Sequence, residues 1–315
     1  MKRAFVFPGQ GSQAVGMGKA LAEAFPQARA VFDEVDDALS QKLSAIMWDG
    51  PLADLTLTAN TQPALMAVSL AAFRVLEAEA GLDLKQHAAF VAGHSLGEYS
   101  ALAAAGSLSI AETARLLRIR GNAMQGAVPV GQGAMAALIG LEFDAALEVA
   151  RAAAEGDVCD AANDNGGAQV VVSGHKAAVE RAIVIAQEKG AKRAVMLTVS
   201  APFHCALMQP AADAMREALA AVTVKPPVVP LVSNVTAGPV TDAAAIRDGL
   251  VRQVTGTVRW RESVAWMASQ GVESFYEVGS GKVLTGLAKR IAPSATGAAI
   301  GTPDDIAAFT ASLQG

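Results

Sequence analysis

Short apolar runs alternate with longer helical patterns in the first 124 residues of the chain. Residues 4–7 and 88–93 are apolar runs closed by glycine or by Pro-Gly, and they predict short buried strands. Four stretches between and after these runs favour helices, at 16–39, 60–81, 95–105 and 109–124. A strand–turn–helix order of this kind predicts a parallel α/β sheet with helices on its faces.

The pattern changes after Met124, where glycines and a proline at 126–133 indicate a linker. The next stretch predicts the order β-α-β-β-α-β, the order of a ferredoxin-like fold, with elements at 134–139, 143–155, 158–162, 169–173, 177–189 and 194–199. We therefore expect a ferredoxin-like subdomain at 127–198, inserted into a larger domain formed by 1–126 and 199–315. Later strands of the large domain are expected at 228–232 and 274–278.

Composition narrows the class of protein. The chain has 315 residues, of which 52% are hydrophobic and 17% charged, which suits a compact enzyme and argues against disorder. A net charge of −5 argues against binding nucleic acid. Cys159 and Cys205 form no CxxC pair, so neither a zinc site nor a disulfide framework is expected, and a reducing cytoplasm is favoured. No apolar run approaches the roughly 20 residues of a membrane span.

A candidate nucleophile lies between the second predicted strand and the helix that follows it. Gly93-His94-Ser95-Leu96-Gly97 matches G-x-S-x-G, and this strand-to-helix context is the one in which that motif positions a nucleophile. The turn presents the Ser95 hydroxyl at the head of a helix, and the Leu96 N–H points to where an oxyanion would form. The alternative is a tight turn with an incidental serine.

A nucleophilic serine needs a base, and the chain has only four histidines. His94 is expected to point away from its neighbour Ser95. His87 precedes the strand at its other end, and His175 suits a helix cap. His204, in a proline-containing loop where the chain re-enters the large domain, is left by elimination, although a lone loop histidine is often structural.

A second glycine-rich turn follows the first strand. Residues 9–14 fit G-x-G-x-x-A, the loose dinucleotide fingerprint, but Pro8 interrupts the strand and no acidic residue ends a clear second strand. A dinucleotide site is therefore not expected. The turn instead suits a second arm of an oxyanion hole near Gln10, and an ordinary glycine turn is the alternative.

Several ordered motifs across the whole chain resemble those of one family, the malonyl-CoA:acyl carrier protein transacylases of bacterial fatty acid synthesis. The motifs are FPGQGSQ (7–13), TQPA (61–64), GHSLGEY (93–99), RG (120–121), FH (203–204), VRW (258–260) and EVGSGK (277–282). The resemblance implies an α/β-hydrolase-like large domain with an inserted ferredoxin-like domain. Two departures are small: Phe203 stands where some relatives have a smaller residue, and Ser280 where glycine-proline-glycine is common.

The same resemblance implies roles for particular residues. Ser95 is expected to be the nucleophile and His204 its base, and the backbone carbonyl of Gln253 is expected to orient the histidine in place of a carboxylate. The oxyanion hole is expected at the backbone N–H groups of Gln10 and Leu96. Arg120 is expected to pair with the malonyl carboxylate.

The resemblance also implies substrates and partners. Malonyl-CoA would be the donor and an acyl carrier protein the partner, whose phosphopantetheine thiol accepts the acyl group; no permanently bound cofactor or metal is expected. Three alternatives stay open: a thioesterase with the same Ser–His pair, an acyltransferase of a polyketide pathway, and a non-enzymatic binding module. Because both substrates are acidic, local basic groups must offset the net charge, and the candidates are Lys189, Lys192, Arg193, Lys282, Lys289 and Arg290.

Overall fold

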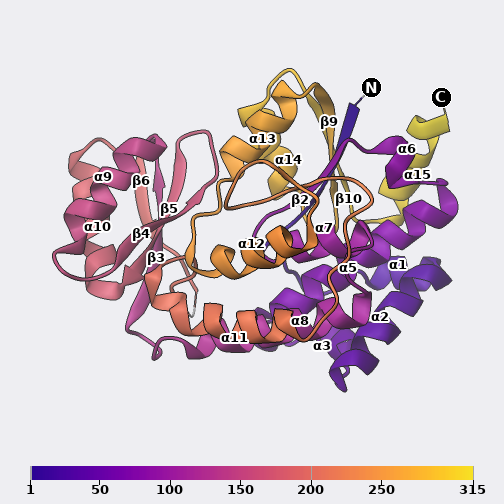
Figure 1. Cartoon of the computed structure of the whole chain (residues 1–315), viewed down its shortest axis with the longest axis horizontal. Coiled ribbons are helices and arrows are strands. Elements are labelled where there is room, and N and C mark those ends of the chain that lie inside the picture. Colours follow the sequence, from indigo (N-terminus) through magenta and orange to yellow (C-terminus); the bar gives the residue numbers. More distant parts are fainter. Residues whose placement is uncertain (1, 200, 315) are drawn as a thin grey trace.

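The computed structural model describes residues 2–199 and 201–314. Their strands form two separate sheets (Figure 1). The larger sheet has the strand order β10-β9-β1-β2-β7-β8 and the smaller one the order β4-β5-β3-β6. The strands are β1 (Lys2–Phe7), β2 (Phe90–Gly93), β3 (Gly133–Ile139), β4 (Cys159–Asp164), β5 (Gln169–His175), β6 (Arg193–Met196), β7 (Leu231–Val232), β8 (Pro239–Val240), β9 (Val272–Val278) and β10 (Thr296–Ile300).

Helices fill most of the remaining chain. They are α1 (Lys19–Ala24), α2 (Pro26–Leu39), α3 (Leu43–Asp49), α4 (Leu52–Thr56), α5 (Thr58–Glu79), α6 (Leu84–His87), α7 (Gly97–Ala104), α8 (Ile110–Gly126), α9 (Phe143–Ala154), α10 (Lys176–Glu188), α11 (Gln209–Ala220), α12 (Ala243–Thr255), α13 (Trp260–Ser269), α14 (Val283–Ile291) and α15 (Pro303–Gln314), with a 3₁₀ turn at Ala206–Met208.

The larger sheet is parallel from β10 to β7, and β1 lies near its middle. Alternate residues of β1 face opposite sides of the sheet. Phe5 and Phe7 join a core that includes the long helix α5, whereas Ala4 and Val6 join a second core with α13 and α14. Helices therefore cover both faces, and only β8 at the edge is antiparallel.

The smaller sheet is antiparallel and is built by the chain order β3-α9-β4-β5-α10-β6, the order of elements that the pattern predicts. Ala136, Leu138, Val170 and Val172 of β3 and β5 pack against α9 and α10. The residues between them point the other way, toward the larger sheet. In Figure 1 this sheet and its two helices lie on the left, beside the larger body.

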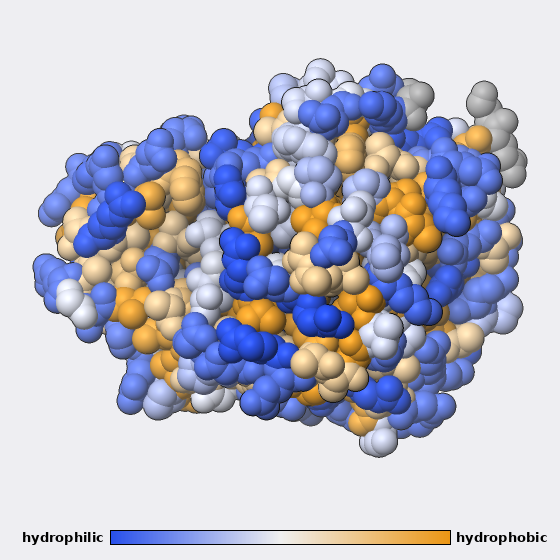
Figure 2. Space-filling model, in the orientation of Figure 1, coloured by the Kyte–Doolittle hydropathy of each residue, from blue (hydrophilic) through white to orange (hydrophobic). Residues whose placement is uncertain are grey.

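Besides the two chain connections, backbone hydrogen bonds link the smaller sheet to the larger body. The backbone N–H of Asp164, at the end of β4, donates to the carbonyl of Val258 at 2.9 Å, and the N–H of Val258 donates to the carbonyl of Ala162 at 2.8 Å. The edge strand of the smaller sheet is thereby held against the loop before α13. Figure 2 shows hydrophobic residues in patches over the middle of one face and hydrophilic residues around its outline.

Three sequence predictions need correction. The helical pattern at 16–39 is two helices, because Pro26 lacks an N–H and begins α2 as its first residue. The strand expected at 228–232 shortens to Leu231–Val232, and the one expected to reach 199 ends at Met196. Ser200, near which we expected the large domain to resume, lies outside the described residues.

Candidate active site

Ser95 lies in the sharp turn between β2 and α7, and its φ of 54° is in the left-handed region that few residues other than glycine adopt. The glycines on either side are required by close packing. A Cβ on Gly93 would lie 1.9 Å from the Gly97 carbonyl, and a Cβ on Gly97 would lie 2.2 Å from the Phe7 carbonyl oxygen. Only glycines allow the turn to fit against β1, and the serine hydroxyl is thereby presented at a fixed point.

His204 is the histidine that meets this hydroxyl. Its Nε2 lies 2.8 Å from Ser95 Oγ, and its Nδ1 lies 2.8 Å from the backbone carbonyl oxygen of Gln253. Because a carbonyl only accepts, Nδ1 carries the proton, which leaves Nε2 free to accept the serine proton. Within the part of the chain that the structure describes, no Asp or Glu side chain is hydrogen-bonded to His204.

The electrostatic surroundings of His204 keep its imidazole neutral. Burial, together with the positive charge of Arg120, lowers the pKa of His204 from 6.5 to about 3. The side chain is therefore ready to accept a proton at neutral pH. The same two effects make it a weak base while Arg120 has no anionic partner.

Arg120 projects from α8 into the same site and is only 1% exposed. Its Nη2 donates to Ser95 Oγ at 3.0 Å and to Gln253 Oε1 at 2.9 Å, and its Nη1 donates to Gln62 Oε1 at 2.8 Å. Its Nε is buried with no hydrogen-bond partner in the described chain, and its guanidinium lies 5.7 Å from the centre of the Tyr99 ring. A buried cation with a free donor beside a nucleophile is suited to hold an anionic substrate group.

The position of Arg120 depends on its neighbour Gly121. A Cβ at Gly121 would lie 2.7 Å from Ala59 Cα and 2.7 Å from the Thr58 carbonyl oxygen, both at the start of α5. Glycine thus lets α8 approach α5 closely and brings Arg120 within reach of Gln62, on the second turn of α5.

The two expected oxyanion donors lie at one end of the same cavity. Gln10 follows β1 and Leu96 precedes α7, and neither backbone N–H has an acceptor among the described residues. The glycine turn at 9–14 opens no helix, since α1 begins only at Lys19. A tetrahedral intermediate would require two such free donors near the nucleophile.

The cavity in which these groups meet has a volume of about 600 Å³. One wall carries Ser95, His204 and Arg120, and the opposite wall is the free face of the smaller sheet. That face contributes Met135, Ala137, Asn163, Gln169 and Val171, which line the cavity with the loop residues Leu197 and Phe203. The site therefore lies between the two sheets.

The side chains of a group of buried amides and a carboxyl support the site, and the sequence indicates no role for these side chains. Asn234 Oδ1 accepts from the Ser95 N–H at 2.8 Å, and Asn234 Nδ2 donates to the Gly93 carbonyl at 2.7 Å. Gln253 Nε2 donates to Glu98 Oε2 at 2.7 Å. The GHSLGEY and TQPA motifs do contain Glu98 and Gln62, but nothing in the local pattern indicates that these side chains are buried.

The other histidines have hydrogen-bond partners other than Ser95. His94 Nε2 lies 2.9 Å from Asn165 Oδ1, and its ring packs 5.7 Å from that of Trp260, so it points away from the serine hydroxyl although it lines the cavity. His87 Nδ1 accepts from the Asp83 N–H at 3.1 Å and His175 Nδ1 from the Val158 N–H at 2.9 Å.

Neither a metal cluster nor a membrane-spanning helix is present in residues 2–199 and 201–314. No group of three or more His, Cys, Asp or Glu side chains there could hold a metal ion. No helix in these ranges is long and apolar enough to cross a membrane.

The elbow serine and its histidine define the class as an enzyme of acyl-group chemistry, and comparison with known proteins identifies it as an acyltransferase. The chain belongs to the acyl transferase family, because the family model described as the acyl transferase domain matches residues 4–299. It is 50% identical over 305 residues to the malonyl CoA-acyl carrier protein transacylase of Escherichia coli K12, covering 97% of each chain.

Solved structures agree with this assignment. The acyl-carrier-protein-S-malonyltransferase of Bartonella henselae superimposes with a TM-score of 0.97 at 58% identity, covering 100% of both chains. A malonyl-transacylase solved in complex with its type II PKS acyl-carrier protein superimposes with a TM-score of 0.95 at 43% identity, covering 99% of this chain and 100% of that chain.

Proposed function

We propose that this enzyme transfers a malonyl group from malonyl-CoA to the phosphopantetheine thiol of an acyl carrier protein, through an ester on Ser95. The observation that carries the proposal is the buried Arg120 guanidinium, 3.0 Å from the Ser95 hydroxyl and without a carboxylate partner in the described chain. It would bind the free carboxylate of malonyl while the thioester carbonyl lies at the serine. The names of the similar proteins support the same substrate.

The first half-reaction acylates the serine. His204 Nε2 takes the hydroxyl proton as Ser95 Oγ forms a bond to the thioester carbon, and the N–H groups of Gln10 and Leu96 stabilise the oxyanion. The C–S bond then breaks, and the coenzyme A thiolate leaves with the proton from His204. The Gln253 carbonyl holds the Nδ1–H of His204 throughout, so that no acidic side chain is needed.

The second half-reaction discharges the serine. The pantetheine thiol enters where coenzyme A left and gives its proton to His204 Nε2, and its sulfur bonds to the malonyl carbonyl carbon. The C–O bond to Ser95 breaks, and the serine recovers the proton. Transfer requires that water be kept from the ester, and a cavity lined on one side by the smaller sheet and on the other by loops and helices of the larger body supports this.

The alternatives differ in what they require of Arg120. A thioesterase for simple fatty acyl groups would gain nothing from a buried cation at the nucleophile, and a binding module would not need a serine, a base and two free oxyanion donors together. A polyketide-pathway enzyme would use the same chemistry with another carrier protein. The chemistry of the site is therefore common to both pathways, and the carrier distinguishes them.

Finer structural assignments belong to the same proposal. We propose an α/β-hydrolase-like arrangement for the large domain, 1–126 and 199–315, and a ferredoxin-like one for the inserted part, 127–198. The parallel order around β1, the elbow at Ser95 and the strand order β4-β5-β3-β6 support them. The free, buried thiols of Cys159 and Cys205 fit a cytoplasmic enzyme.

Basic residues from both parts of the chain meet at one rim of the cavity, where we propose that the acidic carrier docks. In the smaller sheet, Arg193 of β6 lies opposite Ile139 of β3, and Ile139 lies opposite Gln169 of β5, which lines the cavity. From the larger body, Arg290 Nη2 lies 3.5 Å from Gln169 Oε1. Lys192, Lys282 and Lys289 are exposed near these two arginines in the chain. Lys189, by contrast, is paired with Glu148 at 2.8 Å, so its charge is partly offset.

Intact-mass spectrometry tests the proposal. Wild-type enzyme mixed with malonyl-CoA should gain one malonyl group, and carrier protein should remove it. Ser95→Ala should gain none, since loss of a serine nucleophile can cost about a millionfold in turnover. A malonyl adduct that persists on Ser95→Ala, or release of free malonate in place of transfer, would refute the assignment.

A further inference from the structure

Glu98 is a buried carboxyl that the proposed reaction does not use. It lies in the first turn of α7, and it is 1% exposed. Its Oε2 accepts from Gln253 Nε2 at 2.7 Å and from the Asn234 N–H at 3.2 Å. The other end of the same Gln253 amide, Oε1, accepts from Arg120 Nη2 at 2.9 Å. One amide group therefore joins a buried carboxyl to a buried guanidinium.

This arrangement bears on how the charge of Arg120 is balanced. No carboxylate in the described chain lies within ion-pair distance of Arg120, and a buried cation without any counter-charge is costly. The other titratable groups around the two are Tyr99, His94 and His204. Burial raises the pKa of Tyr99 to about 12 and lowers the pKa of both histidines, so all three are neutral near pH 7. Glu98 is the one group among them that can offset Arg120.

We infer that Glu98 is the counter-charge of Arg120 in the empty enzyme, and that it takes up a proton from solvent when a substrate carboxylate binds to Arg120. The inference rests on the proposed function. A malonyl carboxylate bound to Arg120 would be a second anion, beside the Glu98 carboxylate, near the Arg120 guanidinium and the Gln253 amide. Two anions in a buried site repel each other. Protonation of the Glu98 carboxylate removes that repulsion, and the only bond formed is the O–H bond of the Glu98 carboxyl group.

The geometry allows Glu98 to change charge without rearrangement. The hydrogen bonds from Gln253 and Asn234 both reach Oε2, so a proton on Oε1 leaves them intact. Burial raises the pKa of Glu98 to about 7, against the opposing effect of its hydrogen bonds and of Arg120. The carboxyl is thus poised between its two forms near neutral pH. Glu98 touches no substrate in this scheme and is a positioning residue that sets the charge at Arg120.

Proton uptake is the direct test. Malonyl-CoA binding to Ser95→Ala, which cannot be acylated at this serine, should be measured by calorimetry at pH 7 in two buffers of different ionisation enthalpy. Because burial raises the pKa of Glu98 to about 7, part of its population is ionised before binding, so uptake should be a measurable fraction of a proton per site. Acetyl-CoA, which lacks the carboxylate, should give none of this increment.

The control removes the charge and keeps the contact. Glu98→Gln in the same background can still accept from Gln253, and it should bind malonyl-CoA without the uptake. Uptake that is equal for malonyl-CoA and acetyl-CoA, or that persists in Glu98→Gln, would overturn the inference. The second result would assign the proton to His204, whose pKa also rises when Arg120 is neutralised.

A second measurement needs no Glu98 variant. If malonyl-CoA binding to Ser95→Ala takes up a proton, its dissociation constant should rise above pH 7 by up to tenfold per pH unit, whereas that of acetyl-CoA should not. The ratio of the acetyl-CoA to the malonyl-CoA dissociation constant should therefore fall above pH 7. A ratio constant from pH 6 to 9 would also overturn the inference. If malonyl-CoA binds no better than acetyl-CoA at any pH, the proposed substrate fails instead, and the two failures are distinguishable.

Discussion

The residue that we propose decides the substrate class is Arg120. Loss of one partner of a desolvated charge pair costs about 2–5 kcal/mol. We therefore expect Arg120→Ala to lower kcat/KM for malonyl transfer by roughly thirtyfold to several thousandfold. Acetyl transfer has no carboxylate to lose and should suffer far less.

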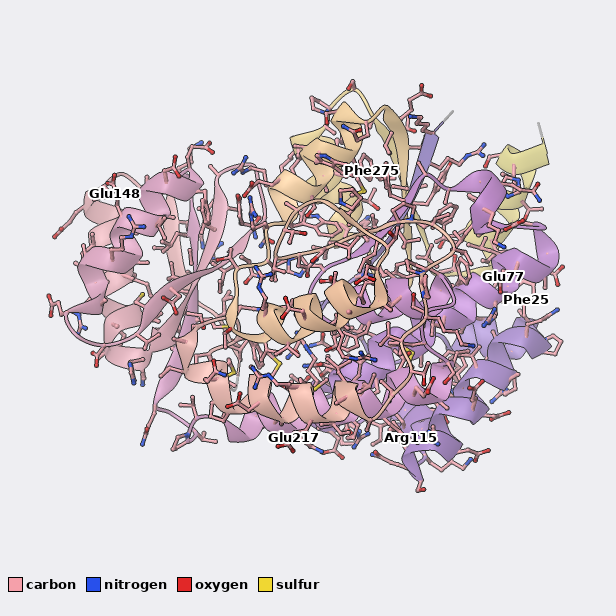
Figure 3. All side chains as sticks on the ribbon, in the orientation of Figure 1. Phe25, Glu77, Arg115, Glu148, Glu217 and Phe275 are labelled. Carbon is pink, nitrogen blue, oxygen red and sulfur yellow. The ribbon has the colours of Figure 1, made fainter. Side chains whose placement is uncertain are left out.

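The matched control lies on the same helix. Arg115 is exposed and lies at the edge of the molecule in Figure 3, and Arg115→Ala should leave both rates unchanged. The measurement is the ratio of malonyl to acetyl kcat/KM in each protein. An equal loss for both acyl groups in Arg120→Ala would make Arg120 structural.

His204 should give stability a characteristic pH dependence. Its pKa is about 3 in the folded protein and 6.5 in the unfolded chain, so the unfolded chain binds more protons between these values. The contribution of His204 to the free energy of unfolding is then constant above pH 6.5 and is lost as pH falls toward 3. Denaturant titrations of wild type and His204→Ala should show a smaller acid destabilisation in the variant, and parallel curves would contradict the burial effect.

Residue roles could be predicted only where a motif carried them. Ser95 has a local signature, whereas His204 lies 109 positions away and was reached by eliminating other histidines. The roles of Glu98 and Asn234 follow from burial and from contacts across more than 130 positions, which a local pattern does not contain.

At the scale of elements, the approach of α8 to α5 positions the arginine. Gly121→Ala would place a Cβ 2.7 Å from backbone atoms at the start of α5, and overpacking of this kind costs typically about 1–3 kcal/mol. We expect lower stability and, because Arg120 moves with the helix, a larger loss for malonyl than for acetyl transfer.

Gly126, the last residue of α8, provides the control. A Cβ there meets nothing within 4 Å, so Gly126→Ala should be neutral or slightly stabilising. Thermal unfolding and both transfer rates of the two variants make the comparison. If the variants behave alike, close packing at Gly121 does not position Arg120.

The elements that could be predicted are those with clear periodicity. The order β3-α9-β4-β5-α10-β6 follows from alternating and helical patterns within one compact stretch. The short strands β8 and β10 escaped prediction, since β8 has two residues and β10 is largely exposed. No helix was predicted for the stretches that form α11 to α15.

At the scale of the whole molecule, local charge must overcome a net charge of −5 if an acidic carrier is to dock. We expect the reversal Arg193→Glu with Arg290→Glu to raise the carrier-protein KM severalfold and to weaken its dependence on salt, because steering depends on the field at the cavity rim. The first half-reaction, measured as malonyl loading of Ser95, should be affected less.

The control for this prediction is Lys176→Glu. Lys176 is exposed at the start of α10, next to the end of β5 that is remote from Gln169, so its reversal should leave the carrier KM unchanged. Unchanged KM in the double reversal would remove the rim from the docking surface. Equal effects of all reversals would indicate a response to net charge alone.

The two walls of the cavity have different consequences for the evolution of substrate choice. Ser95, His204, Arg120 and Gln253 all lie outside the strands of the smaller sheet, which supplies only lining side chains such as Met135, Ala137 and Val171. We therefore expect changes in those lining residues to alter the shape of the cavity while the reacting groups stay in place. The smaller sheet can therefore diversify while the chemistry of the larger body is preserved.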